Sequence, residues 1–154
     1  MEEFSILSIL KKIPIFADLN ESEHQQIINS IMMYYYPTGH VFFNEGDKNP
    51  DDGLYIIKHG MVKISRKDPI SKEDKEISTL IDNDFFGEMA LILDEPRNAS
   101  ATAIADCEVF RLAKKDLMTL MQTNQNLSNK ISAEFIDREK KNDKIAGALG
   151  IHSL

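Results

Sequence analysis

The stretch from residue 34 to residue 112 constrains the fold most, because it alternates short runs of β-branched and aromatic residues with closely spaced turn signals. The turn signals combine Gly, Pro, Asn and Asp, as at 37–39 (PTG), 45–47 (EGD) and 82–84 (DND). The runs between the turns lie at 40–44, 54–58, 61–66, 75–81, 99–105 and 107–112. Many short strands joined by tight turns are typical of a small sandwich or barrel. The sequence therefore predicts a mainly β fold.

Helical patterns flank this β-rich stretch, over 1–33 and 113–149. Asn20 can cap a helix, with Glu23 three positions on as its capping-box partner. A short helix is expected over 114–121. A longer one is expected after it, with a stripe at spacings of three and four formed by Leu127, Ile131, Phe135, Arg138, Asn142, Ile145 and Leu149. We therefore expect helices on both sides of the strands.

Composition narrows the class of protein. A chain of 154 residues is the length of one domain, so we expect 1–154 to form a single one. Asp and Glu number 25 against 18 Lys and Arg, and the net charge of −7 argues against direct nucleic-acid binding. The start MEEF lacks the basic region of a signal peptide, and no apolar run is long enough to span a membrane. With Cys107 as the one cysteine, we expect a cytoplasmic protein without membrane contact.

The segment 85–103, FFGEMALILDEPRNASATA, combines features that suit an anionic ligand with hydroxyl groups. Gly87 permits a close approach of the backbone, and exposed N–H groups in a short turn favour an anion. The Arg97 guanidinium offers a permanent charge and a planar set of donors for phosphate oxygens. Glu88 can accept hydrogen bonds from sugar hydroxyls. On residue types alone, an ordinary surface ion pair between Glu88 and Arg97 remains an alternative.

The same segment resembles the phosphate-binding cassette of cyclic nucleotide-binding domains, the family of the catabolite activator protein and the regulatory subunits of cAMP-dependent protein kinase. The family pattern is F-G-E-hydrophobic-A-L, a few residues, and then P-R-x-A-T/S-x-x-A. This chain matches it with 86–91 (FGEMAL), 96–100 (PRNAS) and Ala103. The resemblance covers roughly 8–143 and implies a double-stranded β-helix (jelly-roll) barrel, with N-terminal helices and C-terminal B/C-type helices.

The resemblance also implies a set of contacts to the phosphate and ribose of a cyclic mononucleotide. They involve Gly87, Glu88, Met89, Ala90, Arg97, Asn98, Ala99 and Ser100. Arg97 pairs with the cyclic phosphate, Glu88 accepts from the ribose 2′-OH, and Gly87 lets the sugar come close. Backbone N–H groups of the same set help to hold the phosphate or ribose, and Ser100 shapes the site. No cofactor and no metal ion are expected.

For the base, the resemblance implies a wall formed by Ile64, Ile77 and Ser78, closed by the last helix. The candidates on that helix are Phe135, Arg138, Glu139, Asn142 and Asp143. Asn98 stands where family members more often carry Ala, Ser or Thr, so the resemblance leaves the identity of the base undecided. We expect cAMP, with cGMP as the alternative. The family often dimerises through the same helix, so a homodimer is one expected assembly. The effector protein is unknown.

The sequence also bears on two other classes of function. A cupin-like metal enzyme needs a set of His ligands, but His24, His40, His59 and His152 show no metal-ligand spacing, and no nucleophile motif is present. We therefore expect no enzyme activity. An interaction protein could keep the barrel and dimerise through the last helix without binding nucleotide. The chain could equally be a regulatory fragment of a larger transcription factor, kinase or channel.

Overall fold

The computed structural model describes residues 5–48, 53–91 and 96–133. Its helices are α1 (Ile6–Leu10), η1 (Pro14–Phe16), α2 (Glu21–Ser30), η2 (Glu88–Leu91) and α3 (Lys114–Thr123). Its strands are β1 (Met32–Tyr36), β2 (Val41–Phe43), β3 (Gly53–His59), β4 (Val62–Lys67), β5 (Asp74–Leu80), β6 (Phe85–Phe86), β7 (Ser100–Ala103) and β8 (Cys107–Ala113). A further helix starts at Gln125 and continues through residue 133.

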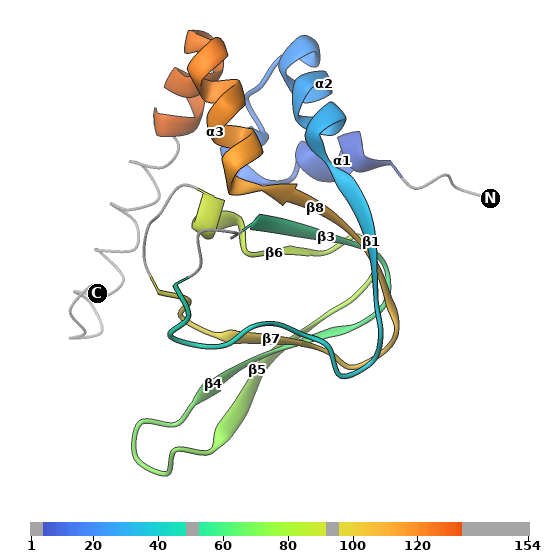
Figure 1. Ribbon diagram of the computed structural model, residues 1–154, viewed down its shortest axis with the longest axis vertical. Coiled ribbons are helices and arrows are strands. Elements are labelled where there is room, and N and C mark those ends of the chain that lie inside the picture. Colours follow the sequence, from blue (N-terminus) through green and yellow to red (C-terminus); the bar gives the residue numbers. More distant parts are fainter. Residues whose placement is uncertain (1–4, 49–52, 92–95, 134–154) are drawn as a thin grey trace.

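The strands form two four-stranded antiparallel sheets, in the orders β1-β8-β3-β6 and β2-β7-β4-β5. Figure 1 shows the helices above the first sheet, and the β4–β5 hairpin of the second sheet extending away from the first. The expected mainly β jelly-roll fold with helical flanks is therefore confirmed, although the described strands do not close the barrel.

Each strand segment predicted from the sequence lies within one or two residues of an observed strand, but β1 and β6 were not predicted. The helical assignment of 1–33 is wrong at its end, because β1 begins at Met32. Three consecutive tyrosines at 34–36 favour extended backbone, and α2 ends two residues before β1 starts. β6 has two residues, too few to give a periodic pattern.

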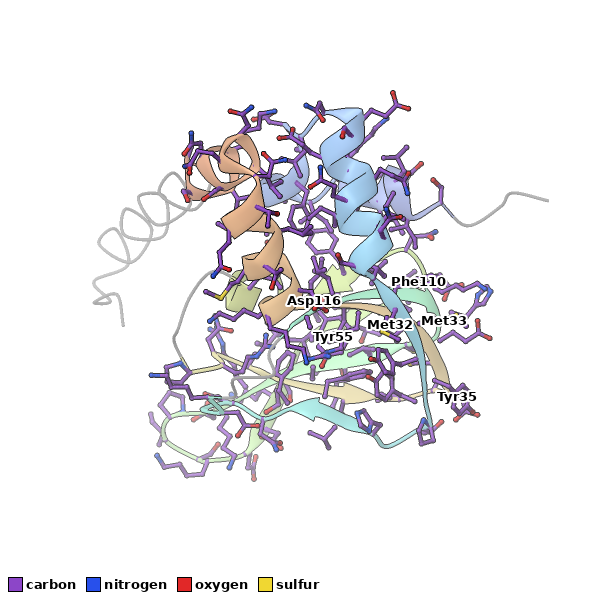
Figure 2. All side chains as sticks on the ribbon, turned by 45° about the horizontal axis from the view of Figure 1, so that its top comes forward. Met32, Met33, Tyr35, Tyr55, Phe110 and Asp116 are labelled. Atoms are coloured by element: carbon purple, nitrogen blue, oxygen red, sulfur yellow. The ribbon has the colours of Figure 1, made fainter. Side chains whose placement is uncertain are left out.

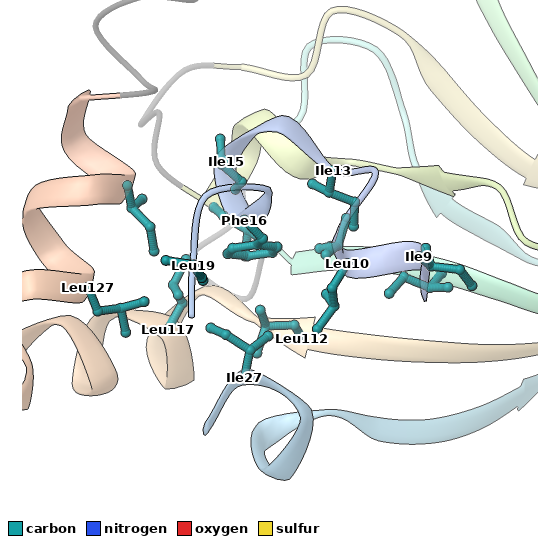
Figure 3. Packing of buried hydrophobic residues seen from close by; sticks show 14 residues of the cluster. Ile9, Leu10, Ile13, Ile15, Phe16, Leu19, Ile27, Leu112, Leu117 and Leu127 are labelled. Atoms are coloured by element: carbon teal, nitrogen blue, oxygen red, sulfur yellow. The ribbon is translucent and has the colours of Figure 1, made fainter. Parts of the chain in front are cut away.

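The larger core lies between the helices and the outer face of the first sheet (Figure 3). Its buried members are Ile9, Leu10, Ile13, Ile15, Phe16, Leu19, Ile27, Leu54, Ile56, Leu91, Leu112, Leu117, Leu127 and Ile131. A second core lies between the two sheets and includes Tyr55, Ile57, Val62, Phe86 and Val109. β3 contributes alternate residues to the two cores, which explains why its sequence LYII shows no alternation of apolar and polar residues.

Side-chain caps fix the starts of α2 and of the helix that begins at Gln125. The Oδ1 atom of Asn20 accepts the N–H of Glu23 at 2.9 Å, and Glu23 Oε1 accepts the N–H of Asn20 at 2.8 Å, so the predicted capping box is confirmed. Asn124 ends α3 and caps the next helix, where its Oδ1 accepts the N–H of Leu127 at 3.1 Å. Leu127 and Ile131, the first residues of the predicted stripe, pack inside their own domain. Among the described helices, none is long and apolar enough to cross a lipid bilayer.

Candidate functional site

The candidate site begins at a tight turn between β6 and η2, where Gly87 has a φ of +82°. Residues other than glycine rarely adopt this backbone conformation. A Cβ atom at Gly87 would also lie 2.8 Å from the carbonyl oxygen of Gly53 and 3.1 Å from Nη1 of Arg97. The backbone at Gly87 therefore touches both strand β3 and the Arg97 guanidinium, and only glycine fits between them.

Arg97 is only 9% exposed, and its position is fixed at both ends. Its backbone N–H donates to the carbonyl of Asp47, and its carbonyl accepts the N–H of Gly46, each at 2.7 Å. The guanidinium carbon lies 3.9 Å from the centroid of the Phe43 ring. A cation over an aromatic face is stabilised by the ring quadrupole. The turn that follows β2 thus holds a permanent positive charge against an aromatic wall.

That wall is a cluster of aromatic rings from three strands. Phe86 stacks on Tyr55 with ring centroids 5.0 Å apart, and Phe42 meets both of these rings edge-on. Phe43, under Arg97, lies 6.1 Å from Phe86. The sequence predicted Phe42, Phe43 and Tyr55 as strand residues, but it did not connect the cluster to Arg97, since the contacts join residues far apart in the chain.

Glu88 opens η2 immediately after the glycine turn, and Met89 and Ala90 follow within the same 3-10 helix. Two side-chain atoms of the cassette, Glu88 Oε2 and Arg97 Nε, are buried and make no hydrogen bond, although both residues have other interactions. Buried polar atoms are normally satisfied by protein groups, water or a bound molecule. Glu88 and Arg97 place a carboxylate and a guanidinium side by side with the Gly87 turn.

The residues after Arg97 are held from two sides. The carbonyl of Asn98 accepts a hydrogen bond from Nε of Arg66 at 2.8 Å. Ser100 Oγ accepts the N–H of Glu45 at 2.8 Å. Ala99 is buried, and β7 then starts at Ser100. Ser100 therefore braces the turn after β2. The supporting roles of Arg66 and Glu45 were missed, because they depend on strand pairing rather than on a local motif.

The residues expected to line a base are only partly brought together. Ile64 and Ser78 are directly opposite on β4 and β5, so they share one face of the sheet. Ile77 is the extra residue of a β-bulge at this point and is 54% exposed. The candidates on the last helix lie outside the described residues: Phe135, Arg138, Glu139, Asn142 and Asp143.

Within the described ranges, no group of three or more His, Cys, Asp or Glu side chains is arranged to hold a metal ion. Burial raises the pKa of the Cys107 thiol, whose Sγ donates to the carbonyl of Ala105 at 3.2 Å. A buried thiol with a raised pKa is a poor nucleophile.

Three comparisons place the chain among known proteins. A family model described as the cyclic nucleotide-binding domain matches residues 34–124. A cGMP-dependent protein kinase of Caenorhabditis briggsae is 37% identical over 123 residues, which are 79% of this chain and 16% of the kinase. A cAMP-dependent protein kinase regulatory subunit of Aspergillus fumigatus is 30% identical over 114 residues, 74% of this chain and 26% of that subunit.

Among solved structures, the catabolite activator protein of Thermus thermophilus superposes with a TM-score of 0.67 at 26% identity, covering 89% of this chain and 63% of that one. The chain thus spans less than two thirds of the length of each of these three proteins.

Proposed function

The chain belongs to the cyclic nucleotide-binding domain family, and we propose that it is a non-enzymatic sensor that binds cAMP through residues 85–103. The observation that carries the proposal is the position of Arg97, a sheltered guanidinium against the Gly87 turn. The residues around it match the family cassette in sequence. A single fixed cation can dominate the local field although the chain carries a net charge of −7.

Binding transfers one negative charge from water to the protein. Arg97 and the N–H groups at 90, 98 and 99 replace the hydration of the cyclic phosphate, and Glu88 accepts from the ribose 2′-OH. Charge-assisted hydrogen bonds contribute about 1.5–3 kcal/mol each. Apolar contact of the base with Ile64 adds to the affinity. The Ser78 hydroxyl lies directly opposite Ile64, on the same face of the sheet. No step of this scheme breaks a covalent bond.

The choice between cAMP and cGMP depends on the base contacts. Named relatives include a cGMP-dependent kinase and a cAMP-dependent regulatory subunit, so both ligands occur within the family. Asn98, next to Arg97, can donate either to the phosphate or to guanine. We propose cAMP as the ligand and keep cGMP as the alternative.

A thermal-shift series tests the ligand. A ligand at about 100 times its dissociation constant adds roughly 2.7 kcal/mol of stability. We expect cAMP, but not AMP, to raise the melting temperature, and Arg97→Ala to abolish this shift. Glu88→Ala should weaken binding less, because it removes a hydroxyl contact rather than the partner of a charge. A melting temperature of Arg97→Ala that rises with cAMP as in the wild type would show that the site is misassigned.

Signalling requires that the ligand favour one position of the C-terminal helix over another. We propose that bound nucleotide repositions this helix and that an effector protein, so far unknown, reads the change. Hydrogen exchange with and without saturating cAMP tests it. The proposal requires slower exchange in 85–103 and in 126–145 together. Slower exchange confined to 85–103 would show that binding does not reach the helix.

The competing function is an interaction protein that dimerises without nucleotide. The inward packing of Leu127 and Ile131 leaves 135–149 to form such a seam, which lies outside the described residues. A melting temperature unchanged by cAMP, cGMP, a cyclic dinucleotide and AMP alike would favour this function. The activity of any larger protein that contains this domain is not determined by the domain itself.

A further inference from the structure

A row of directly opposite residues crosses three strands of the first sheet and ends at the candidate site. Arg111 on β8 pairs with Tyr55 on β3, and Tyr55 pairs with Phe86 on β6. Directly opposite residues of paired strands share one face of a sheet, and this face is turned to the second core. Phe86 immediately precedes Gly87, whose turn contacts Arg97. Arg111 thus lies at the far end of a row that reaches the cassette.

Aromatic rings fill the space between the two guanidinium groups. The guanidinium carbon of Arg111 lies 5.9 Å from the centroid of the Tyr55 ring. The Tyr55 and Phe86 rings stack with an interplanar angle of 12°. The centroid of Phe86 is 6.1 Å from that of Phe43, the ring on which the Arg97 guanidinium lies. The two cations therefore lie at opposite ends of one continuous group of rings.

A backbone contact links the same two arginines. Gly53 lies on β3, two residues before Tyr55. A Cβ atom at Gly53 would lie 3.1 Å from Nε of Arg111, and the Gly53 carbonyl oxygen lies 2.8 Å from the Cβ position of Gly87. The backbone at Gly53 therefore fills the space between the Arg111 side chain and the Gly87 turn.

Tyrosine side chains hold Arg111 in this row. Its guanidinium donates a hydrogen bond to the Tyr55 hydroxyl. Burial lowers the pKa of Arg111, but three neighbouring tyrosines raise it, above all Tyr55, and the net shift is upward. The other two are Tyr36 and Tyr34. A half-buried guanidinium carries a desolvation cost that an apolar side chain of the same length would avoid. The contacts to the tyrosines offset this cost and fix the direction of the side chain.

We propose that Arg111 is a positioning residue of the nucleotide site, an inference that rests on the proposed function. Arg111 holds the Tyr55 ring, on which Phe86 stacks. Phe86 in turn fixes the start of the glycine turn and the Phe43 ring under Arg97. The hydrogen bonds of a guanidinium to a phosphate depend on the direction of its planar donors, so a tilt of these rings lowers the affinity. Arg111 acts through the rings and not by contact with the nucleotide.

Calorimetric titration of the full chain with cAMP tests the proposal. We expect Arg111→Met to raise Kd at least about fivefold, because it keeps the length of the side chain but loses both contacts to Tyr55. Arg111→Lys should not restore the affinity, since an ammonium lacks the planar donors and the ring stacking of a guanidinium. Tyr55→Phe keeps the stacked ring and should raise Kd about threefold. Thermal melting without ligand checks that each variant is folded.

Tyr35→Phe is the matched control. It also removes a tyrosine hydroxyl that is hydrogen-bonded, in this case to Asp106, but Tyr35 is 64% exposed. Figure 2 shows Tyr35 at the outer edge of the molecule and Tyr55 in its interior. Because Tyr35 has no place in the row, Tyr35→Phe should bind cAMP like the wild type.

A double-mutant cycle gives a readout that a general loss of stability would not move. If Arg111 acts through Tyr55, the variant with both Arg111→Met and Tyr55→Phe should bind about as weakly as Arg111→Met alone. Independent effects would instead multiply to a loss of roughly fifteenfold. Losses that multiply would contradict the proposed route from Arg111 to the cassette.

The outcomes separate this inference from the function on which it rests. A wild type that binds no cyclic nucleotide would overturn both. A wild type that binds cAMP, with equal affinity in Arg111→Met and Tyr55→Phe, would overturn the role of Arg111 alone. Full affinity in Arg111→Lys, with a loss in Arg111→Met that high salt abolishes, would show that Arg111 acts by its charge at a distance, and it would overturn the positioning role.

Discussion

Nζ of Lys130 lies 2.7 Å from Oε1 of Glu23, across 107 positions of sequence. Glu23 is only 2% exposed, and the same oxygen accepts the N–H of Asn20 at 2.8 Å. One carboxylate oxygen therefore completes the cap of α2 and holds the helix that starts at Gln125. If the C-terminal helix moves on binding, as we propose, it must either carry this ion pair along or break it.

We predict that Lys130→Met lowers the free energy of unfolding by about 1 kcal/mol. The substitution leaves Glu23 buried without its cation, while the part-exposed Lys130, at 38%, limits the loss through solvent screening. Lys115→Met is the control, since Lys115 lies exposed on α3 and its removal takes away the same charge without breaking an ion pair between described residues. Urea denaturation measures both variants. Equal losses would mean that the net charge, not the Glu23 contact, is responsible.

We predict that the contribution of Glu23 disappears in acid. Hydrogen bonding to the Asn20 N–H, followed by the bond to Lys130, holds the pKa of Glu23 below its ordinary value of 4.5. A lowered pKa in the folded state stabilises the fold above the unfolded pKa, and this stability is lost as the pH falls through the folded value. The difference in unfolding free energy between the wild type and Glu23→Gln should be constant from about pH 7 to pH 5. It should shrink below 4.5. A difference that does not change with pH would show that ionisation of Glu23 is not involved.

The sequence predicts local motifs of this fold, but not the contacts between residues far apart in the chain. The Asn20–Glu23 capping box spans three positions, and the strand segments carry their own turns, so both could be predicted. The cassette is a contiguous motif for the same reason. The Glu23–Lys130 pair, in contrast, depends on how helices pack, and the hydrogen bond from Arg66 to Asn98 depends on the pairing of β4 with β7. No spacing rule encodes these contacts.

The edge position of β1 could not be predicted for a related reason. An apolar strand such as MMYYY is expected inside a sheet, and only strand order shows that one side of it is free. Ile77 is a further case, because the β-bulge that removes it from register with Ile64 and Ser78 has no signal in the sequence.

We predict that Gly87→Ala weakens nucleotide binding at least about tenfold, because its Cβ would meet the Gly53 carbonyl and displace Arg97. Gly39→Ala is the matched control. Gly39 also has a positive φ, of +94°, but nothing lies within 4 Å of its Cβ position. Both variants should lose about 1–2 kcal/mol of stability from backbone strain. Only Gly87→Ala should lose affinity in calorimetric titrations. A matching loss of affinity in Gly39→Ala would attribute the effect to general destabilisation.

The last prediction concerns the support of the cassette by β4. Arg66 donates from Nε to the carbonyl of Asn98, and it thereby fixes the peptide that follows Arg97. Loss of one hydrogen bond of about 1 kcal/mol weakens binding roughly fivefold, so we expect this loss of cAMP affinity in Arg66→Met. Lys67→Met removes an equal charge from the next residue. Lys67 contacts Glu45 through its backbone N–H, and the substitution leaves this hydrogen bond in place. Its affinity should stay within about twofold of the wild type. Calorimetric titration of both variants at low and high salt separates loss of the hydrogen bond to Asn98 from loss of a positive charge. If Lys67→Met lost as much affinity as Arg66→Met, and salt abolished both losses, Arg66 would act through its charge at long range rather than by holding Asn98.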